Sequence, residues 1–295
     1  MQRAEAIATA LSTVQERWGP HSLTRGWSGR SRAAVRHGWE RPSWWPGASS
    51  LPRPTVLELA GAPSCGKLSL AMLWLAAADR GGLIAVVDEA HTFYPPAAVA
   101  CGLDLGRLVV VRPPAARAAM DAAGLLLASE GFDAVLWPVG ARTRPNGATA
   151  ARLAAQAAHA NTTLLTLLTR SGLSRSGADG RRLVSTELGP SCVPADVRLS
   201  IARHEWLWHD GVLAGSRLLV QAARVRGGAP ERDWELTLTG APLGPSPRVD
   251  GDGRAAGGVR LAAAVPAGGG AAAEAGRGGE AAGDLRAQRA LASAG

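Results

Sequence analysis

From Val56 onward, short apolar runs alternate with stretches of helical length, and this alternation restricts the chain to few folds. Five apolar runs, VLELA, LIAVVD, RLVVV, AVLWPV and TLLTLLT, are separated by predicted helices at about 66–79, 95–101, 115–130 and 148–160. Apolar strands separated by helices form a mainly parallel sheet that is covered on both faces. We therefore expect an α/β domain with a mainly parallel central sheet flanked by helices.

After Gly172 strand patterns follow one another without helices, in VRLSIA, SRLLVQAARV and WELTLTG. We expect these to be antiparallel C-terminal strands on the same sheet. The expected division is a packing helix at 1–20, a linker at 21–54, the α/β core at 55–240 and a disordered, low-complexity tail at 241–295. The first helix carries an apolar stripe, so it must pack on another surface; the stripe is Ile7, Leu11, Val14 and Trp18.

Composition limits the compartment and the partners. The formal net charge of +8 favours an anionic partner such as nucleic acid. No window approaches the roughly 18 uncharged apolar residues of a membrane span, and the N-terminus lacks a signal-peptide core. The three cysteines, Cys65, Cys101 and Cys192, form no CxxC pair. The sequence therefore predicts a cytoplasmic protein with buried, reduced thiols, no disulfide framework and no zinc site.

One phosphate-binding motif stands out. Residues 61–67, GAPSCGK, match the pattern GxxxxGK between a predicted strand and a predicted helix. In that setting backbone N–H groups and the helix N-terminus surround phosphates, and the lysine reaches the terminal ones. We expect ATP or ADP to bind at Gly61, Ala62, Pro63, Ser64, Cys65, Gly66, Lys67, Leu68 and Ser69. Of 32 basic residues only Lys67 is lysine, which indicates a site where guanidinium cannot replace ammonium.

The usual metal ligands of such a loop are missing from the sequence. A Ser or Thr normally follows the lysine and holds Mg²⁺ together with an acidic residue from a later strand. Leu68 stands at the first position, and Ser69 lies about 100° further round the helix. Trp137-Pro138 stands where the acid is expected. The sequence predicts nucleotide binding with no catalytic residue and very weak or absent ATP hydrolysis, and it leaves Mg²⁺ open.

Several segments together resemble the RecA recombinase family. LSTVQERWGPHSLTRG at 11–26 is similar to the helix and turn that RecA proteins pack against a neighbouring subunit. GAPSCGKLSLAML is similar to their phosphate loop, VVDEAHTFYPPAAVACGLDLGRLVVVRP at 86–113 to their DAEH region, and ADVRLSIARHEW at 195–206 to their late strands. The resemblance covers about residues 5–240 apart from the linker. It implies a RecA-like P-loop core and self-association through the N-terminal helix.

Carried onto this sequence, the resemblance keeps some functional positions and loses others. Asp88 and His91 match the ends of the DAEH motif. Ala90 stands where the water-orienting glutamate belongs, and Glu89 is its neighbour. Tyr94 falls in the adenine-contacting segment, where it either stacks on a base or only packs.

The two DNA-binding loops of the family are both altered here. After the strand that ends near Pro138 the chain offers only ARTRPNG, with Arg142 and Arg144. The second loop spans 169–195, and its arginines are Arg170, Arg175, Arg181 and Arg182. Arginines hold phosphates without selecting sequence, so these residues either contact single-stranded DNA or form a solvated face.

Within the superfamily, GLDLGRLVVVRP and the weak strand AVLWP resemble the ImuA group of degenerate RecA relatives. That resemblance implies an accessory role in DNA damage tolerance and SOS mutagenesis, with an error-prone DNA polymerase, RecA or both as partners. One alternative is an active DNA-dependent ATPase of recombination and repair, which needs a replacement carboxylate from Glu89 or Asp88. Another is an interaction domain whose loop binds nothing.

The stretch His204-Glu205-Trp206-Leu207-Trp208-His209 brings two histidines and a glutamate together. The histidines are five residues apart, whereas a helical pair of zinc ligands needs four. We therefore expect an exposed hairpin with packed tryptophans and no metal.

Overall fold

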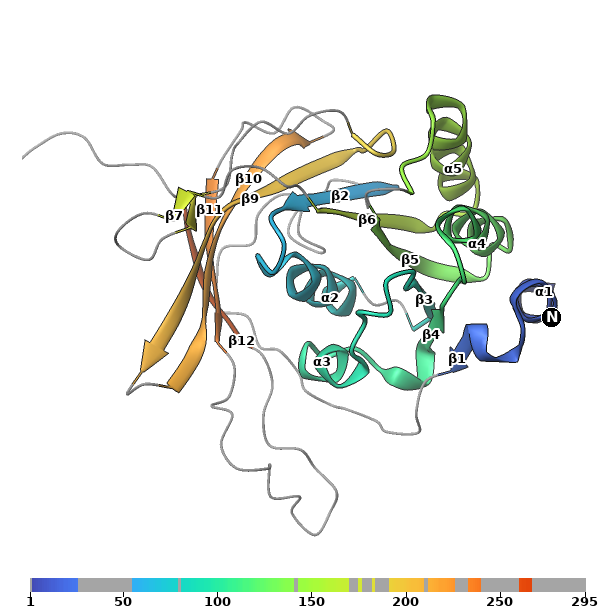
Figure 1. Cartoon of the computed structure of the whole chain (residues 1–295), viewed down its shortest axis with the longest axis horizontal. Helices are drawn as coiled ribbons and strands as arrows, with labels where there is room; N and C mark the ends of the chain where they lie inside the picture. The colour runs from blue at the N-terminus through green and yellow to red at the C-terminus, as the bar shows by residue number, and fades with distance from the viewer. Residues whose placement is uncertain are drawn as a thin grey trace, which may run out of the picture.

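The computed structural model describes residues 2–25, 55–78, 81–140, 143–169, 175–176, 182–183, 191–209, 212–225, 233–239 and 260–266. Their strands join into one mixed sheet with helices on both faces (Figure 1). The path through the sheet runs β1-β4-β3-β5-β6-β2-β9-β10-β11-β12.

Five parallel strands form the centre of this sheet. They are β2 (Val56–Gly61), β3 (Leu83–Val87), β4 (Leu108–Val111), β5 (Phe132–Val139) and β6 (Thr163–Thr169). All six residues of β2 are buried, as expected for a strand covered on both faces. The predicted parallel core is confirmed.

The helices divide between the two faces of the sheet. On one face lie α2 (Lys67–Ala77) and α3 (Pro95–Ala100), and on the other α1 (Gln2–Trp18), α4 (Ala116–Ala128) and α5 (Gly147–His159). A short 3₁₀ turn, η2 (Leu105–Arg107), precedes β4. Helix α2 buries every residue from Leu70 to Leu75, because the parallel strands and the curved end of the sheet both pack on it (Figure 1).

The antiparallel extension is also confirmed. Strand β9 (Val197–His209) pairs in parallel with β2, and β10 (Val212–Val225), β11 (Asp233–Thr239) and β12 (Arg260–Pro266) follow as antiparallel neighbours. A small hairpin of β7 (Arg175–Ser176) and β8 (Arg182–Leu183) lies against β9. The seven residues of β12 fall inside the tail expected to be disordered, so that expectation does not hold for them.

The N-terminal helix packs on the core of its own chain. Leu11 and Val14 are buried among residues of α4 and the sheet. After Trp18 a 3₁₀ turn, η1 (Pro20–Ser22), leads into β1 (Leu23–Arg25), which pairs antiparallel with β4 at the sheet edge. These two elements lie within the stretch expected as linker, so the ordered N-terminal unit extends to Arg25.

Candidate functional site

The phosphate loop connects β2 to α2 and is packed against the antiparallel strands. Gly66 caps α2 in the left-handed region, with φ of 85°, and a Cβ there would lie 3.1 Å from Cδ2 of Leu218 on β10. Ala62 and Cys65 point inward, whereas Pro63 and Ser64 are exposed. A glycine is thus required at this corner by both backbone conformation and space. The first amides of an α-helix such as α2 have no hydrogen-bond partner within the helix itself.

Lys67 lies half-buried in the loop. Its Nζ donates a hydrogen bond of 2.9 Å to the Ala62 carbonyl. Burial lowers the pKa of Lys67 below its ordinary 10.5, and the nearby Cys65 only partly offsets this. No carboxylate pairs with the ammonium within the part of the chain that the structure describes. An anion entering the loop would therefore meet a cation that lacks a negative partner there.

The positions that usually hold Mg²⁺ do not fit the ion. Leu68, in the first turn of α2, packs against the hydrophobic core, and its side chain has no oxygen that could coordinate a metal ion. Trp137 is fully buried on the opposite face of the sheet, among residues of α4 and α5. No group of three metal-binding side chains occurs among the described residues. We therefore derive no step through a metal.

Asp88 belongs to a turn rather than to an open site. Its Oδ1 accepts hydrogen bonds from the amides of Thr92 (2.8 Å) and Phe93 (3.2 Å), and its Oδ2 lies 3.3 Å from Nε of Arg112. The side chain is 1% exposed. Because these contacts use both oxygens, Asp88 is a poor replacement for the missing catalytic carboxylate.

Glu89 is better placed for chemistry. Its Oε2 accepts a 2.6 Å hydrogen bond from Oγ1 of Thr143, in the loop after β5, while Ala90 is exposed. The chain leaves β3 toward α3 on one face and leaves β5 toward α5 on the other. Ligands of α/β sheets bind in the crevice at such a divergence. Thr143 could not be found from the sequence, because a lone threonine after a strand belongs to no recognisable motif.

A buried carboxylate missed by the sequence analysis is Glu58 in β2. It lies 2.6 Å from Nε of Arg198 on β9 and accepts hydrogen bonds from Ser191 Oγ (2.8 Å) and the Cys192 amide (2.7 Å). Burial, with a smaller contribution from Glu58, raises the pKa of Cys192 to about 12 despite the charge of Arg144. Glu58 therefore fixes the returning end of the second candidate DNA loop.

The candidate DNA-contacting arginines divide into three groups. Arg144 is exposed, and its charge acts on Cys192, which places the first candidate loop near the end of the second. Arg175 and Arg182 lie on β7 and β8. The remaining three, Arg142, Arg170 and Arg181, lie outside the described residues.

Comparison with known proteins gives a partial match. Residues 46–172 match the family model of the MT3502 N-terminal domain. A stretch of 139 residues is 32% identical to the RecA protein of Rubrobacter xylanophilus and 30% identical to that of Roseiflexus sp. strain RS-1. Over this stretch the chain is similar to RecA proteins. The match covers 46% of this chain and 40% and 39% of those two proteins, so it spans well under half of their length.

Among solved structures, a crystal structure of the RadB recombinase aligns with this RecA-like chain with a TM-score of 0.44 and 18% identity, over 63% of this chain and 88% of that one. No helix among the described residues is long and apolar enough to span a membrane. All three cysteines, Cys65, Cys101 and Cys192, are buried, as expected.

Two aromatic expectations for the RecA-like chain change. Tyr94 precedes α3 with 65% of its surface exposed, so it does not pack in the core. Trp206 and Trp208 are on a hairpin, as expected, but are 50% and 66% exposed instead of packed. The expectation of packing was wrong. The alternation of residues along HEWLWH shows that the two tryptophans share one face of the strand, but it does not show whether other parts of the protein cover that face.

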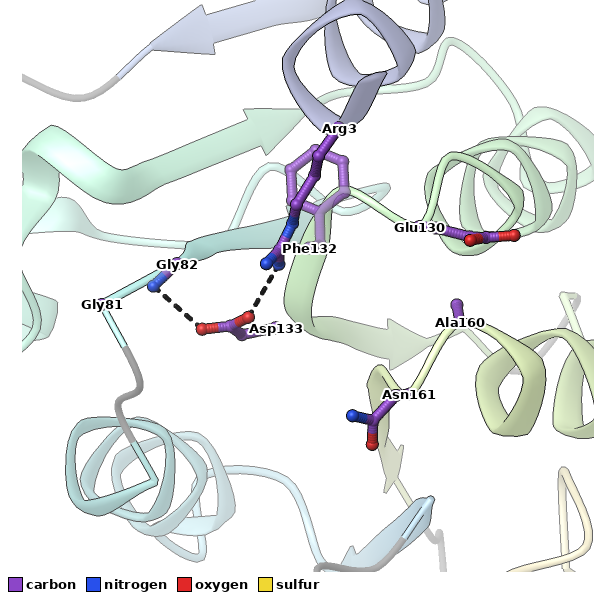
Figure 2. A pocket seen from close by; sticks show the side chains of 8 residues that line it. All are labelled: Arg3, Gly81, Gly82, Glu130, Phe132, Asp133, Ala160 and Asn161. Atoms are coloured by element: carbon purple, nitrogen blue, oxygen red, sulfur yellow. Dashed lines mark hydrogen bonds and ion pairs between the residues drawn. The ribbon is translucent and has the colours of Figure 1, made fainter. Parts of the chain in front are cut away.

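A cavity of about 380 Å³ lies at the N-terminal ends of β3 and β5. Figure 2 shows Asp133 between Arg3 of α1 and the amide of Gly82, with a distance of 2.9 Å to each. These contacts attach the N-terminal helix to the strands of the RecA-like core. The cavity thus belongs to the contact between α1 and the strands. The phosphate loop follows the C-terminal end of β2, at the opposite ends of the parallel strands.

Proposed function

We propose that this RecA-like chain binds ATP or ADP in the loop at residues 61–69 without efficient hydrolysis, and serves as an accessory protein in DNA damage tolerance. The supporting observation is Lys67, a half-buried ammonium with a lowered pKa, whose Nζ donates a 2.9 Å hydrogen bond to the Ala62 carbonyl and pairs with no carboxylate among the described residues. An isolated buried charge is unfavourable unless a partner arrives. Phosphate oxygens are such a partner, and the α2 amides supply further donors.

Each residue of the loop has a defined part in this proposal. The backbone N–H groups from Ser64 to Ser69 would surround the phosphates, and Lys67 Nζ would move from the Ala62 carbonyl to a phosphate oxygen. The bound nucleotide would supply a negative charge to a cation that has no carboxylate partner among the described residues. Leu68 and Trp137 provide no metal ligand, which supports binding over hydrolysis.

The accessory role rests on the resemblance to the ImuA group together with the missing catalytic groups. An error-prone DNA polymerase, RecA or both are the proposed partners, with single-stranded DNA held by the arginines of the two candidate loops. Support for a shared DNA surface comes from Arg144, whose charge acts at Cys192 near the end of the second loop.

Thermal denaturation with and without ADP or ATP tests nucleotide binding. A ligand that binds only the folded chain raises Tm, by an amount equivalent to about 2.7 kcal/mol at 100 times its Kd. We expect this shift in the wild type and in Arg152→Met, an exposed change on α5, and its loss in Lys67→Met. An absent shift in the wild type would favour the interaction domain whose loop binds nothing.

The alternative, an active DNA-dependent ATPase, is favoured by one observation. Glu89 presents a carboxylate at the edge of the sheet where β3 and β5 diverge, and Thr143 orients it. ATP turnover that single-stranded DNA stimulates and that Glu89→Gln removes would establish this activity. Turnover that stays at the background of Lys67→Met would support the accessory role, for which a damage-induced mutagenesis assay with Lys67→Met is the cellular test.

A further inference from the structure

Two exposed tryptophans on β9 have no role in the function proposed so far. Trp206 is 50% and Trp208 is 66% exposed. They are two residues apart on one strand, so both side chains lie on the same face, about 7 Å apart along the strand. Large aromatic groups exposed together indicate a binding surface.

This face is the one that carries the phosphate loop. Trp206 lies opposite Ser216, and His204 lies opposite Leu218, whose side chain packs at Gly66. Opposite residues of an antiparallel pair share a face, so the row from Leu218 through His204 to Trp206 leads away from the loop. His204 meets the Trp206 ring edge-on, with centroids 4.4 Å apart and an interplanar angle of 85°. The His204 ring therefore holds the Trp206 ring in one orientation, while half of the Trp206 surface stays exposed to solvent.

Charge is divided between the two faces of the hairpin. Glu205 and Glu235 lie on the reverse face, where Arg217 reaches both, at 3.5 Å and 2.9 Å. On the tryptophan face, the pairing register places no carboxylate beside Trp206: its neighbours are His204, Ser216 and Leu218. Nothing among these described neighbours would repel a phosphate backbone.

Strand β8, a described part of the second candidate DNA loop, pairs with β9 along the same row. In this pairing the backbone of Arg182 lies opposite that of His204, two residues along β9 from Trp206. The antiparallel register thus brings a basic residue of that loop next to the aromatic pair. Stacking surfaces flanked by basic residues are typical of proteins that bind single-stranded nucleic acid.

We infer that Trp206 and Trp208 form a stacking platform for unpaired bases of single-stranded DNA, next to the strand position of the basic residue Arg182. The inference rests on the DNA contact in the proposed function and names the residues that would hold the bases. Duplex DNA keeps its bases stacked on one another, so the platform selects unpaired strands. A protein partner is the competing occupant, and the test separates the two.

Fluorescence anisotropy of the full chain with a labelled oligothymidylate of about 20 nucleotides tests the platform. We expect Trp206→Ala and Trp208→Ala each to weaken binding about 10-fold, and Trp206→Phe and Trp208→Phe to retain most of it, because phenylalanine still stacks. The slope of log affinity against log salt should stay unchanged in the alanine variants, since stacking releases no counterions. Arg182→Ala should reduce that slope by about 0.7.

Leu207→Ala is the matched control, because Leu207 lies between the tryptophans on the other face of β9. It should bind as the wild type does. A wild type that does not bind the oligonucleotide would overturn the proposed DNA contact itself. A wild type that binds, with alanine variants that bind equally well or phenylalanine variants as weak as alanine, would overturn only the platform. If the alanine variants bound DNA as the wild type does but no longer captured the polymerase or RecA, the two tryptophans would form a protein-binding surface instead.

Discussion

The lowered pKa of Lys67 makes both the stability of the protein and its nucleotide affinity depend on pH. Because its pKa is lowered in the fold, the unfolded chain holds this proton more tightly than the native state does. The free energy of unfolding of the free protein should then rise with pH between the lowered pKa and 10.5. A bound phosphate reverses the situation, because it stabilises the ammonium and raises the pKa of Lys67 again.

Nucleotide affinity should therefore fall as pH rises through a value below 10.5, where free Lys67 loses its proton. Calorimetric titration of ADP in buffers of different ionisation enthalpy would detect the proton taken up on binding near that pH. Lys67→Met should show no such uptake, and a weaker affinity by about 10- to 100-fold at neutral pH, the loss of a hydrogen bond to a charged group. Affinity independent of pH up to 10.5 would contradict this role of the lysine.

Gly66 is expected to tolerate no side chain. Gly66→Ala forces an L-residue to φ of 85° and brings its Cβ to 3.1 Å from Leu218, which should lower the free energy of unfolding by about 1–3 kcal/mol. Gly147→Ala is the control, since nothing lies within 4 Å of a Cβ there and the residue begins α5 in a helical conformation. Urea denaturation should show Gly147→Ala to be neutral or slightly more stable. Equal effects of the two changes would argue against a strained loop.

At the scale of single elements, Glu58 joins β2 to the segment that returns from the second loop. Glu58→Gln removes the buried carboxylate charge that lies 2.6 Å from Nε of Arg198 and should cost about 3–5 kcal/mol of unfolding free energy. Loosening of residues 191–195 should also speed the alkylation of Cys192, which is slow while its pKa is about 12. Mass spectrometry after iodoacetamide treatment measures that rate.

Glu205→Gln is the matched control, because it breaks a partly exposed pair with Arg217 at 3.5 Å. Pairs of that kind contribute about 1 kcal/mol or less. Cys192 should then react at the wild-type rate. If Glu58→Gln and Glu205→Gln behave alike, Glu58 does not hold the loop.

Most elements were predictable from local sequence, for a physical reason. The parallel strands are apolar and the helices between them fill the distance back to the next strand, so periodicity alone located them. Strand β1 was not predictable, because its three residues carry no pattern and exist as a strand through pairing with β4. Glu58 was hidden similarly, since its partner Arg198 is 140 residues away.

In the candidate site, too, some features could be predicted from the local sequence and others depend on long-range contacts. Its motif, with Gly61, Gly66 and Lys67, is local and was visible in the sequence. The link from Glu89 to Thr143 and the exposure of Trp206 depend on which strands are neighbours. Sheet order is a long-range property, so a single sequence does not reveal it.

For the whole molecule, the N-terminal unit closes one edge of the sheet. Val14 is fully buried, and Ile7 lies where a side chain on Gly131 would have to be. Val14→Asp places an unpaired carboxylate in this contact and should release α1 and β1 together. The apolar strand β4 would then expose its backbone, and exposed edges associate.

Light scattering and thermal denaturation would test this release. We expect Val14→Asp to lower stability by about 2–5 kcal/mol and to self-associate. Ser12→Asp adds the same charge at an exposed position two residues earlier and should remain as the wild type. A Val14→Asp protein that stays monomeric and stable would show that the N-terminal unit is dispensable for closing the edge.

The packing of Trp137 limits which residues this position can accept. It stands where the resemblance places a metal-holding acid, and its ring now fills space among α4, α5 and the sheet. Returning an aspartate to that position would leave a large void and a desolvated carboxylate, two changes that each cost several kcal/mol. A single change of Trp137 to an acid would therefore be strongly destabilising, and the position could accept one only if the residues around the ring changed as well.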